Sequence, residues 1–184
     1  MPAMIHLGRP LMAALICFGR SVSMNLPPRL FAIARLIPPG SRVADVGTDH
    51  GKLAVWLLEQ GVCSCVVATD VAPGPLSAAR RNAMRAGVVS GLDFRLADGL
   101  AAVSPEEIDM VVIAGMGGET IMRILARTPW LKSESYRIIL QPQSKIPELL
   151  DFLSIEGYLI LAQHFVEDAG RQYTIFEVTA WDYI

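Results

Sequence analysis

Acidic and glycine residues gather at the ends of several short apolar runs in this sequence, where strands are expected to give way to helices. The first such stretch, Asp45–Gly51, reads DVGTDHG. A glycine-rich turn between a strand and a helix is typical of a site for a nucleotide-like ligand. A dinucleotide is disfavoured, because a G-x-G-x-x-G pattern read from Gly47 puts Asp49 and Lys52 at its second and third glycines. An aspartate at the second position would add bulk and repel a pyrophosphate.

A ligand that carries positive charge suits this turn better. S-adenosylmethionine contains a sulfonium and an ammonium group and no pyrophosphate, so the carboxylates of Asp45 and Asp49 would face charges of the opposite sign. The structural alternative is that Asp49 only caps the helix that follows, since aspartate is a favoured N-cap residue. The two roles are compatible, and the sequence leaves both open.

Two further acidic residues stand at strand ends. Asp70 follows Gly47 by close to the separation of about 20 residues at which a carboxylate accepts hydrogen bonds from ribose hydroxyls. A solvated aspartate at a strand end is the alternative there. Asp98 precedes Gly99 and could bond to an adenine amino group, or stand in an ordinary Asp-Gly turn.

The fourth strand end is the stretch Ala114–Gly118, which reads AGMGG. Three glycines in four residues are costly in conformational entropy, so they make sense where a ligand or a flat base must approach the backbone. They also leave backbone N–H groups free at the start of the next helix. A tight strand-to-helix turn is the alternative interpretation.

Strands and helices are expected to alternate along the chain and so to place these strand ends at one edge of a sheet. Apolar runs predict strands at 42–46, 63–69, 92–96, 108–114, 136–140, 158–166 and 172–179. Helical spacing predicts helices at 30–37, which Pro27 and Pro28 could start, and at 53–60, 75–86, 119–127 and 146–156. This alternation predicts an α/β protein with a mostly parallel, seven-stranded sheet and helices on both faces. The last two strands lie too close for a helical crossover and predict an antiparallel hairpin at a sheet edge.

Composition excludes several classes of protein. The chain has 184 residues, of which 52% are apolar and 18% charged, which is the opposite of an intrinsically disordered composition. The three cysteines, Cys17, Cys63 and Cys65, are odd in number and exclude a disulfide scaffold. The three histidines do not pair with them at zinc-site spacing, so we expect no metal.

An RNA partner would need a local basic patch. The formal net charge is −2, so no global basic field attracts nucleic acid. The candidate phosphate contacts are Arg80, Arg81 and Arg85 on one predicted helix, with Arg29 and Arg35. A solvated helix face is the alternative interpretation.

The start of the chain is expected to lie outside the fold. We predict that residues 1–23 are an extension and that residues 24–184 form a single domain. The apolar run at 11–18 is much shorter than the about 20 residues that span a bilayer, so we expect no membrane segment. A docked helix and a secretory signal without a convincing cleavage site are the alternatives for this run. The expected location is the cytoplasm.

Taken together, these motifs resemble class I S-adenosylmethionine-dependent methyltransferases. More narrowly, they resemble the bacterial tRNA (adenine(22)-N1)-methyltransferase family, the TrmK-like proteins. The matching pieces run from about Leu30 to the end: DVGTDH, the acidic strand end at Asp70, ADGL at Ala97–Leu100, AGMGG, ILQP at Ile139–Pro142 and EDAGRQY at Glu167–Tyr173. DVGTDH together with AGMGG is a fairly specific pair, whereas either alone would support only the broad fold.

The resemblance implies a Rossmann-like class I methyltransferase fold with S-adenosylmethionine across the ends of the first three strands. It places the methionine part among Asp45, Gly47, Thr48, Asp49 and His50. It places the ribose and adenine beside Asp70, Val71, Asp98 and Gly99, with Ala114 and Gly115 completing the cofactor site. It implies that Gly115, Met116, Gly117 and Gly118 form the floor for the target adenine.

The expected reaction is methyl transfer to N1 of an adenine in tRNA, at position 22. N1 carries a lone pair at neutral pH, so positioning and desolvation could provide most of the acceleration without a strong base. His50 could orient the substrate or accept a proton, or only shape the cofactor loop. The alternatives are methylation of another RNA or a small molecule, an NAD-dependent oxidoreductase, and a binding module without activity.

Two features depart from the family pattern. Lys52 and Ala54 stand where the family more often has an aromatic residue and a proline. The family usually continues into a helical extension that is thought to help hold tRNA, whereas this sequence stops at Ile184. The second feature bears on tRNA binding and on the target more than on the cofactor.

Overall fold

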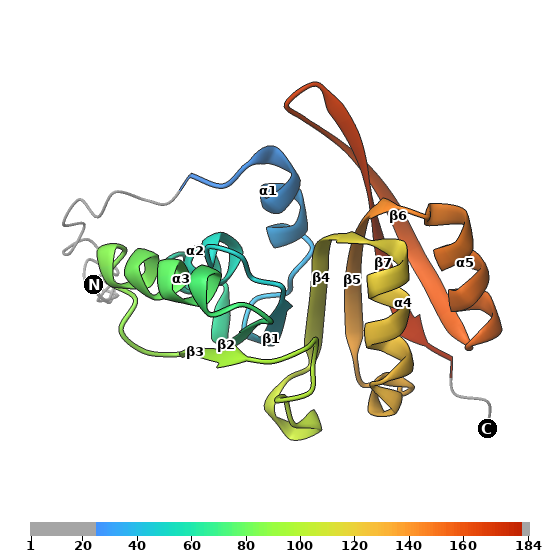
Figure 1. Cartoon of the computed structure of the whole chain (residues 1–184), viewed down its shortest axis with the longest axis horizontal. Coiled ribbons are helices and arrows are strands. Elements are labelled where there is room, and N and C mark those ends of the chain that lie inside the picture. The colour runs from blue at the N-terminus through green and yellow to red at the C-terminus, as the bar shows by residue number, and fades with distance from the viewer. Residues whose placement is uncertain (1–24, 182–184) are drawn as a thin grey trace, which may run out of the picture.

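The computed structural model describes residues 25–181 of the chain. Its centre is one seven-stranded sheet with helices on both faces (Figure 1). The strands are β1 (Ser41–Val46), β2 (Cys63–Asp70), β3 (Leu92–Leu96), β4 (Met110–Gly117), β5 (Arg137–Ser144), β6 (Tyr158–Asp168) and β7 (Arg171–Ala180). Across the sheet they stand in the order β3-β2-β1-β4-β5-β7-β6.

The sheet is parallel except at one edge. Strands β1 to β5 pair in parallel, whereas β7 runs antiparallel between β5 and β6. The predicted α/β fold with a C-terminal antiparallel hairpin is therefore confirmed. The strand order reverses between β1 and β4, and the crevice beyond the carboxyl ends of the strands at such a point is where open α/β sheets bind ligands.

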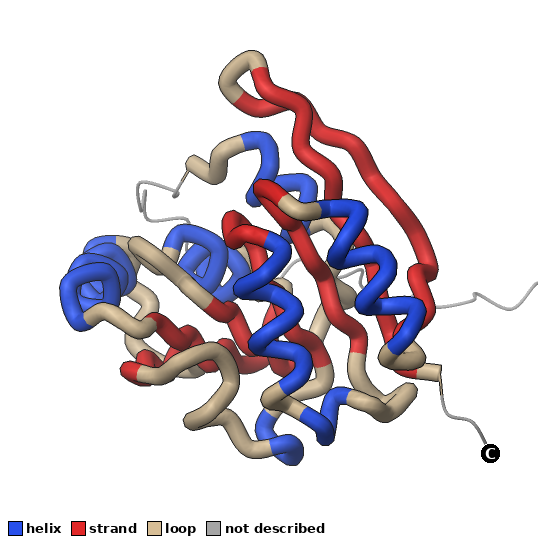
Figure 2. Tube along the Cα trace, turned by 45° about the vertical axis from the view of Figure 1, so that its right-hand side comes forward, coloured by secondary structure: helices blue, strands red, loops and turns tan. Residues whose placement is uncertain are grey.

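Two hydrophobic cores hold the helices against the two faces. The helices are α1 (Pro28–Ala34), α2 (Lys52–Glu59), α3 (Pro73–Arg85), α4 (Gly118–Ala126) and α5 (Ile146–Ile155), with short 3-10 turns at Pro105–Glu107 and Pro129–Leu131. Alternate residues of β4 point to opposite faces, as a strand requires: Val112 packs with α1 to α3, and Val111 with α4 and α5. Figure 2 shows α4 and α5 side by side on one face of the sheet.

The AGMGG stretch is a bulged strand end and not the tight strand-to-helix turn that was the alternative interpretation. Strand β4 continues to Gly117, because Met116 pairs with Pro142 and Gly117 with Ser144 through two irregularities of register. Gly115 has a φ of 75°, a left-handed conformation that favours glycine. The side chain of Gln141 accepts a hydrogen bond from the Gly115 N–H at 3.1 Å. The predicted strands at 108–114 and 136–140 are therefore both too short at their carboxyl ends.

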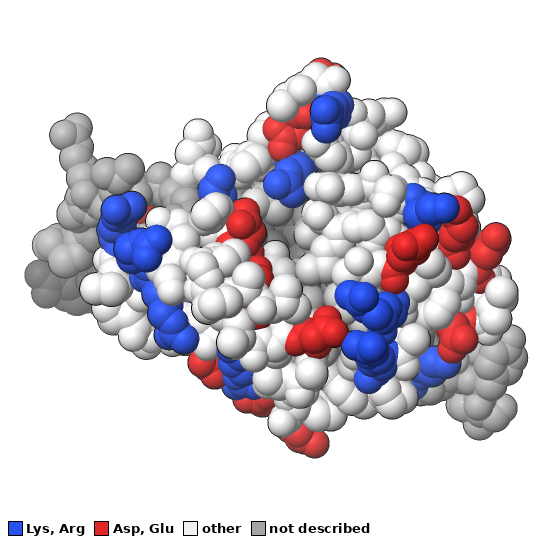
Figure 3. Space-filling model, in the orientation of Figure 1, with Lys and Arg blue, Asp and Glu red and all other residues white. Residues whose placement is uncertain are grey.

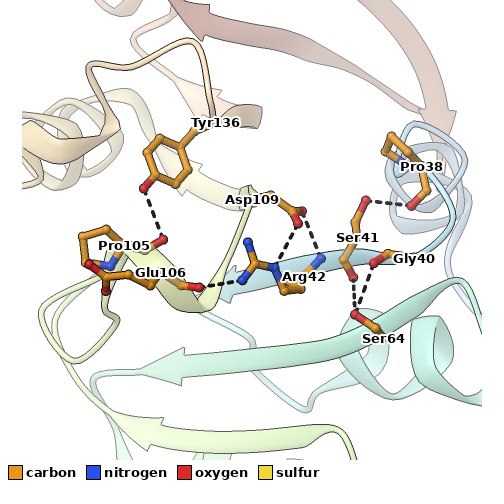
Figure 4. A network of polar contacts seen from close by, with 9 residues as sticks. All are labelled: Pro38, Gly40, Ser41, Arg42, Ser64, Pro105, Glu106, Asp109 and Tyr136. Carbon is orange, nitrogen blue, oxygen red and sulfur yellow. Dashed lines mark hydrogen bonds and ion pairs between the residues drawn. The ribbon is translucent and has the colours of Figure 1, made fainter.

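A polar network at the amino edge of the sheet ties strand starts to their loops (Figure 4). The Arg42 N–H and guanidinium donate to the Asp109 carboxylate at 2.9 and 3.2 Å. The same guanidinium donates to the Glu106 carbonyl, and the Tyr136 hydroxyl donates to the Pro105 carbonyl at 3.2 Å. These groups bond to one another, so the network stabilises the edge opposite the switch-point crevice.

The predicted extension at 1–23 lies outside the described residues. Within residues 25–181, no helix is both long and apolar enough to cross a membrane. In the same range, no three of the histidine, cysteine and acidic side chains are grouped closely enough to hold a metal ion.

Candidate functional site

A pocket of about 290 Å³ lies at the switch point between β1 and β4. Seven of the predicted site residues line it: Asp45, Gly47, Thr48, Asp49, His50, Ala114 and Gly115. Six others line it as well: Pro27, Arg29, Leu30, Lys52, Leu53 and Gln143. Figure 3 shows a hollow in this region, between the surface over α2 and α3 and the surface over α4 and α5.

Asp45 is the buried charge of the pocket. It lies at the end of β1 with only 5% of its surface exposed, and the Thr48 hydroxyl donates to its Oδ2 at 2.6 Å. Burial raises the pKa of Asp45 to about 6, an effect to which the nearby Asp70 charge adds and which the Thr48 hydrogen bond opposes. A cationic group beside Asp45 would offset this cost, whereas Arg29 and Lys52, which also line the pocket, supply positive charge to the rest of its wall.

The turn after β1 is held open by backbone geometry. Gly47 and Asp49 both have positive φ, 70° and 55°, and Asp49 is one of few described non-glycine residues in that region. Helix α2 begins after Gly51, and no side chain caps its N-terminus. The capping alternative for Asp49 is therefore wrong. The Asp49 carboxylate is 70% exposed, 3.5 Å from His50 Nε2, so both side chains stay accessible at the rim.

Asp70 joins the ends of β1 and β2. Its Oδ2 accepts a hydrogen bond from the Asp49 N–H at 3.2 Å, and its Oδ1 accepts one from the Ala72 N–H at 2.9 Å. Each carboxylate oxygen keeps a further lone pair that a ribose hydroxyl could use. Val71, next to it, is 68% exposed. Neither Asp70 nor Val71 lines the pocket itself, so they lie beside it.

Asp98 lines a different hollow, of about 260 Å³, and neither it nor Gly99 lines the Asp45 pocket. The Arg127 guanidinium donates to Asp98 Oδ2 at 2.9 Å, and this pair is solvent-exposed. The Gly99 carbonyl accepts a hydrogen bond from the buried Thr69 hydroxyl at 2.8 Å, which ties this turn to β2. A ligand that uses the Asp98 carboxylate therefore has to compete with an arginine.

The glycine stretch has two halves with different surroundings. The Met116 side chain lies against Gly47, where a Cβ on the glycine would come within 3.8 Å of the sulfur and clash with the terminal methyl. Gly118 is buried, and a Cβ there would lie 2.7 Å from the Lys145 carbonyl oxygen. Gly117 and Gly118 do not line the pocket. Both glycines lie against Ser144 or Lys145, so they allow α4 to pack closely against the turn between β5 and α5.

Arg29 and Gln143 complete the pocket wall above the glycine stretch. Arg29, on α1, forms an ion pair with Asp168 at the tip of the β6–β7 hairpin, at 3.5 Å. Figures 1 and 2 show α1 beside that hairpin. The sequence suggested Arg29 only as a phosphate contact and gave Gln143 no role. EDAGRQY, which contains Asp168, was the one signal that the hairpin tip belongs to the site.

The three arginines of α3 differ from one another. Arg80 donates to the Phe94 carbonyl at 2.9 Å, and its guanidinium lies 5.1 Å from the centre of the Phe94 ring. It therefore helps to pack α3 against β3. Arg81 and Arg85 are exposed, and lysine and arginine atoms follow the outer side of α3 at the left of Figure 3.

Comparison with known proteins decides the family. A family model described as a methyltransferase domain matches residues 26–176. The tRNA (adenine(22)-N(1))-methyltransferase of Bacillus subtilis is 31% identical over 159 residues, which cover 86% of this chain and 67% of the relative. The chain belongs to the tRNA (adenine(22)-N1)-methyltransferase family. The resemblance drawn from DVGTDH and AGMGG is thus confirmed.

Solved structures of the family agree. The crystal structure of the B. subtilis m1A22 tRNA methyltransferase TrmK has a TM-score of 0.81 at 31% identity, over 86% of this chain and 68% of that one. M. capricolum TrmK, solved in complex with S-adenosyl-homocysteine, has a TM-score of 0.73 at 27% identity, over 85% of this chain and 70% of that one. The predicted class I methyltransferase fold is confirmed.

Proposed function

We propose that this protein transfers a methyl group from S-adenosylmethionine to N1 of adenine 22 in tRNA. The observation that carries the proposal is a buried carboxylate, Asp45, in a pocket at the switch point of a chain that belongs to this methyltransferase family. Residues 24–184 act as a single catalytic domain in the cytoplasm.

The pocket residues fit the charges of the cofactor. Asp45 and Asp49 supply carboxylates for its cationic methionine end, and Thr48 fixes the Asp45 carboxylate by a hydrogen bond of 2.6 Å. Asp70 supplies acceptors for the ribose from beside the pocket, held by two backbone N–H groups. Asp98 lines a separate hollow and would have to exchange its hydrogen bond with Arg127 for one with the adenine amino group.

The proposed methyl transfer requires no general base from the protein. S-adenosylmethionine supplies a methyl group on a sulfonium, and the N1 lone pair forms the new C–N bond as the C–S bond breaks with its electrons remaining on sulfur. N1 carries no proton at neutral pH, so no base has to remove one before attack. The residues of the pocket therefore position the base, exclude water and balance charge. His50 is exposed at the rim, where it can orient the substrate.

The floor for the target base is Gly115, at the bulge of β4, because Met116, Gly117 and Gly118 do not line the pocket. At Gly115 no side chain stands between the backbone and the pocket, and Met116 fills the space toward Gly47. Reaching N1 requires that the adenine leave its stack in the folded tRNA. Arg81 and Arg85 provide exposed positive charge for phosphates.

Cofactor and substrate are tested in one experiment. Purified protein is incubated with labelled S-adenosylmethionine and, in parallel, with unmodified tRNA and a set of small acceptors. We expect label in tRNA only, and at one nucleotide. Label only in small acceptors would overturn the tRNA assignment, and cofactor binding without any transfer would indicate a binding module.

A further inference from the structure

Two N–H-bearing side chains face one point above the floor of the pocket. A Cβ built on Gly115 would lie 3.7 Å from Nε2 of Gln143 and 3.6 Å from Nη1 of Arg29. Both side chains also line the 290 Å³ pocket. Gly115 has no Cβ, so a flat ligand that rests on it meets these two groups at its edge.

The Gln143 amide is free to bind a ligand. It lies in the last residues of β5, is exposed, and makes no hydrogen bond with any other residue in the described part of the chain. Gln141, two residues earlier, is fully buried and uses both ends of its amide, accepting from Gly115 and donating to the Pro142 carbonyl. Gln141 therefore supports the floor, whereas Gln143 projects an unused donor and acceptor above it.

Arg29 is held on the other side of the same point. Its Nε pairs with Asp168 at 3.5 Å, and the two side chains are only 29% and 15% exposed. This pairing engages the Nε side of the guanidinium. The Nη1 group remains beside the Gly115 floor and completes a narrow space with Gln143.

Because N1 is the reacting atom, its position determines which edge of adenine can lie against Gln143 and Arg29. When N1 points at the methyl donor, the edge that carries N6 and N7 is the polar edge left for the protein. A glutamine amide can pair with that edge by accepting from the N6 amino group and donating to N7. Guanine carries an oxygen in place of the amino group, so it would set two acceptors against each other.

From this geometry we infer that Gln143 recognises the N6/N7 edge of the target adenine and selects adenine over guanine, with Asp168 positioning Arg29 to bound the space. This inference rests on the proposed function. It assigns a contact to the substrate base and none to the cofactor.

The test replaces N7 of the substrate base by a C–H group and removes the Gln143 amide from the protein. Wild-type protein and the Gln143→Ala variant are assayed on two tRNAs that carry either adenosine or 7-deazaadenosine at the methylated position. The 7-deaza base lacks only the N7 acceptor. Any change in the reactivity of N1 is common to both proteins, so it cancels when the two ratios of kcat/KM are compared.

We expect the ratio of kcat/KM between adenosine and 7-deazaadenosine to be about tenfold larger for wild type than for Gln143→Ala, within the range for one good base contact. Gln143→Glu keeps the acceptor for N6 and loses the donor for N7, so it should resemble Gln143→Ala in this ratio. Gln163→Ala, on β6 and outside the pocket lining, is the matched control and should keep the wild-type ratio. S-adenosylmethionine affinity, measured by calorimetry, should not change in any variant.

The two proposals fail in different ways. If wild type methylates adenosine tRNA but shows the same ratio as Gln143→Ala, the contact to N7 is wrong and the proposed function stands. If wild type methylates neither tRNA, the proposed function is wrong and the inference falls with it.

Discussion

At the scale of single residues, the protein buries a carboxylate that its own fold does not neutralise. Asp45 is 5% exposed, and within residues 25–181 its carboxylate accepts hydrogen bonds from the Thr48 hydroxyl and the Ala54 backbone but from no cationic side chain. Keeping that charge in the free protein costs stability, which binding of a cationic ligand would recover. Such a trade of stability for binding is common at functional sites.

The raised pKa gives a signed prediction for stability. The folded-state pKa of Asp45 is about 6, against an ordinary value of 3.8, so between these values the folded state binds more protons than the unfolded one. The free energy of unfolding should therefore fall as the pH rises through this window, by up to about 3 kcal/mol for this group. Asp45→Asn removes that loss.

Denaturant titrations at pH 8 and pH 4.5, without ligand, check this prediction. The Asn variant should be more stable than wild type at pH 8, and the gap should be much smaller at pH 4.5. A variant that is equally stable or less stable at pH 8 would show that the Asp45 charge is compensated in the free protein.

Cofactor binding should respond to the same group in the opposite sense. A cationic ligand requires the ionised carboxylate, so protonation of Asp45 weakens binding as the pH falls below about 6. We expect the Kd for S-adenosylmethionine to rise by up to about tenfold between pH 7 and pH 5, since each pH unit below the pKa costs at most a factor of ten. Calorimetry at both pH values measures this, and Asp45→Asn should bind weakly at both. A Kd that does not change with pH would contradict a role of the Asp45 carboxylate in cofactor binding.

At the scale of elements, the paired ends of β4 and β5 lie beside the pocket, and the start of α4 packs tightly against the turn between β5 and α5. Gly118 begins α4 directly under the turn between β5 and α5, where a Cβ would lie 2.7 and 2.8 Å from the carbonyl oxygens of Lys145 and Ser144. Both contacts are with backbone, which cannot swing away as a flexible side chain can. The glycine is therefore required by packing.

Gly118→Ala should lower the free energy of unfolding by about 1–3 kcal/mol, the usual cost of overpacking. Gly74→Ala is the matched control, because Gly74 lies in the first turn of α3, has no positive φ, and has open space at its Cβ. That control should be neutral or slightly stabilising. Equal effects of the two substitutions in denaturant titrations would contradict the packing role of Gly118.

The sequence predicted the elements well and their junctions less well. Periodicity predicted the seven strands and the five α-helices, although α1 ends at Ala34 and the two 3-10 turns were not predicted, because burial on one or both faces sets the spacing of apolar residues. It could not show that β4 and β5 continue as a bulged pair through Gly115 and Gly117, since that pairing depends on a neighbour distant in sequence. Spacing likewise grouped Asp98 with Asp45, whereas an ion pair with Arg127 holds Asp98 in another hollow.

Arg29, Gln143 and Asp168 show a second limit. They lie on α1, at the end of β5 and at the hairpin tip, and only the antiparallel return of β6 and β7 brings the tip to α1. No local pattern marks such a junction. A shared family motif indicated the hairpin tip, and nothing in the sequence indicated Gln143.

At the scale of the whole molecule, the net charge of −2 means that the proposed tRNA substrate would have to bind through a local basic surface. Arg81 and Arg85 are exposed on α3 and do not line the Asp45 pocket. An Arg81→Ala, Arg85→Ala double variant should weaken tRNA binding and flatten its dependence on salt. The slope of log K against log salt should fall by about 0.7–0.9 for each phosphate that the variant no longer neutralises.

Filter binding or fluorescence anisotropy across a salt series measures that slope, and calorimetry should show S-adenosylmethionine affinity unchanged. Arg80 is not a suitable choice, because its interactions with Phe94 would add a packing effect. An unchanged slope would place the tRNA surface elsewhere on the molecule.

The central claim is that the pocket between β1 and β4 brings the methyl donor to N1 of one adenine in tRNA. The most direct measurement is to incubate the protein with labelled S-adenosylmethionine and unmodified tRNA, digest the product and map the labelled nucleotide by mass spectrometry. We predict a single 1-methyladenosine at position 22, absent with Asp45→Asn. Transfer to another atom or another position, or tRNA left without label while the cofactor binds, would contradict the claim.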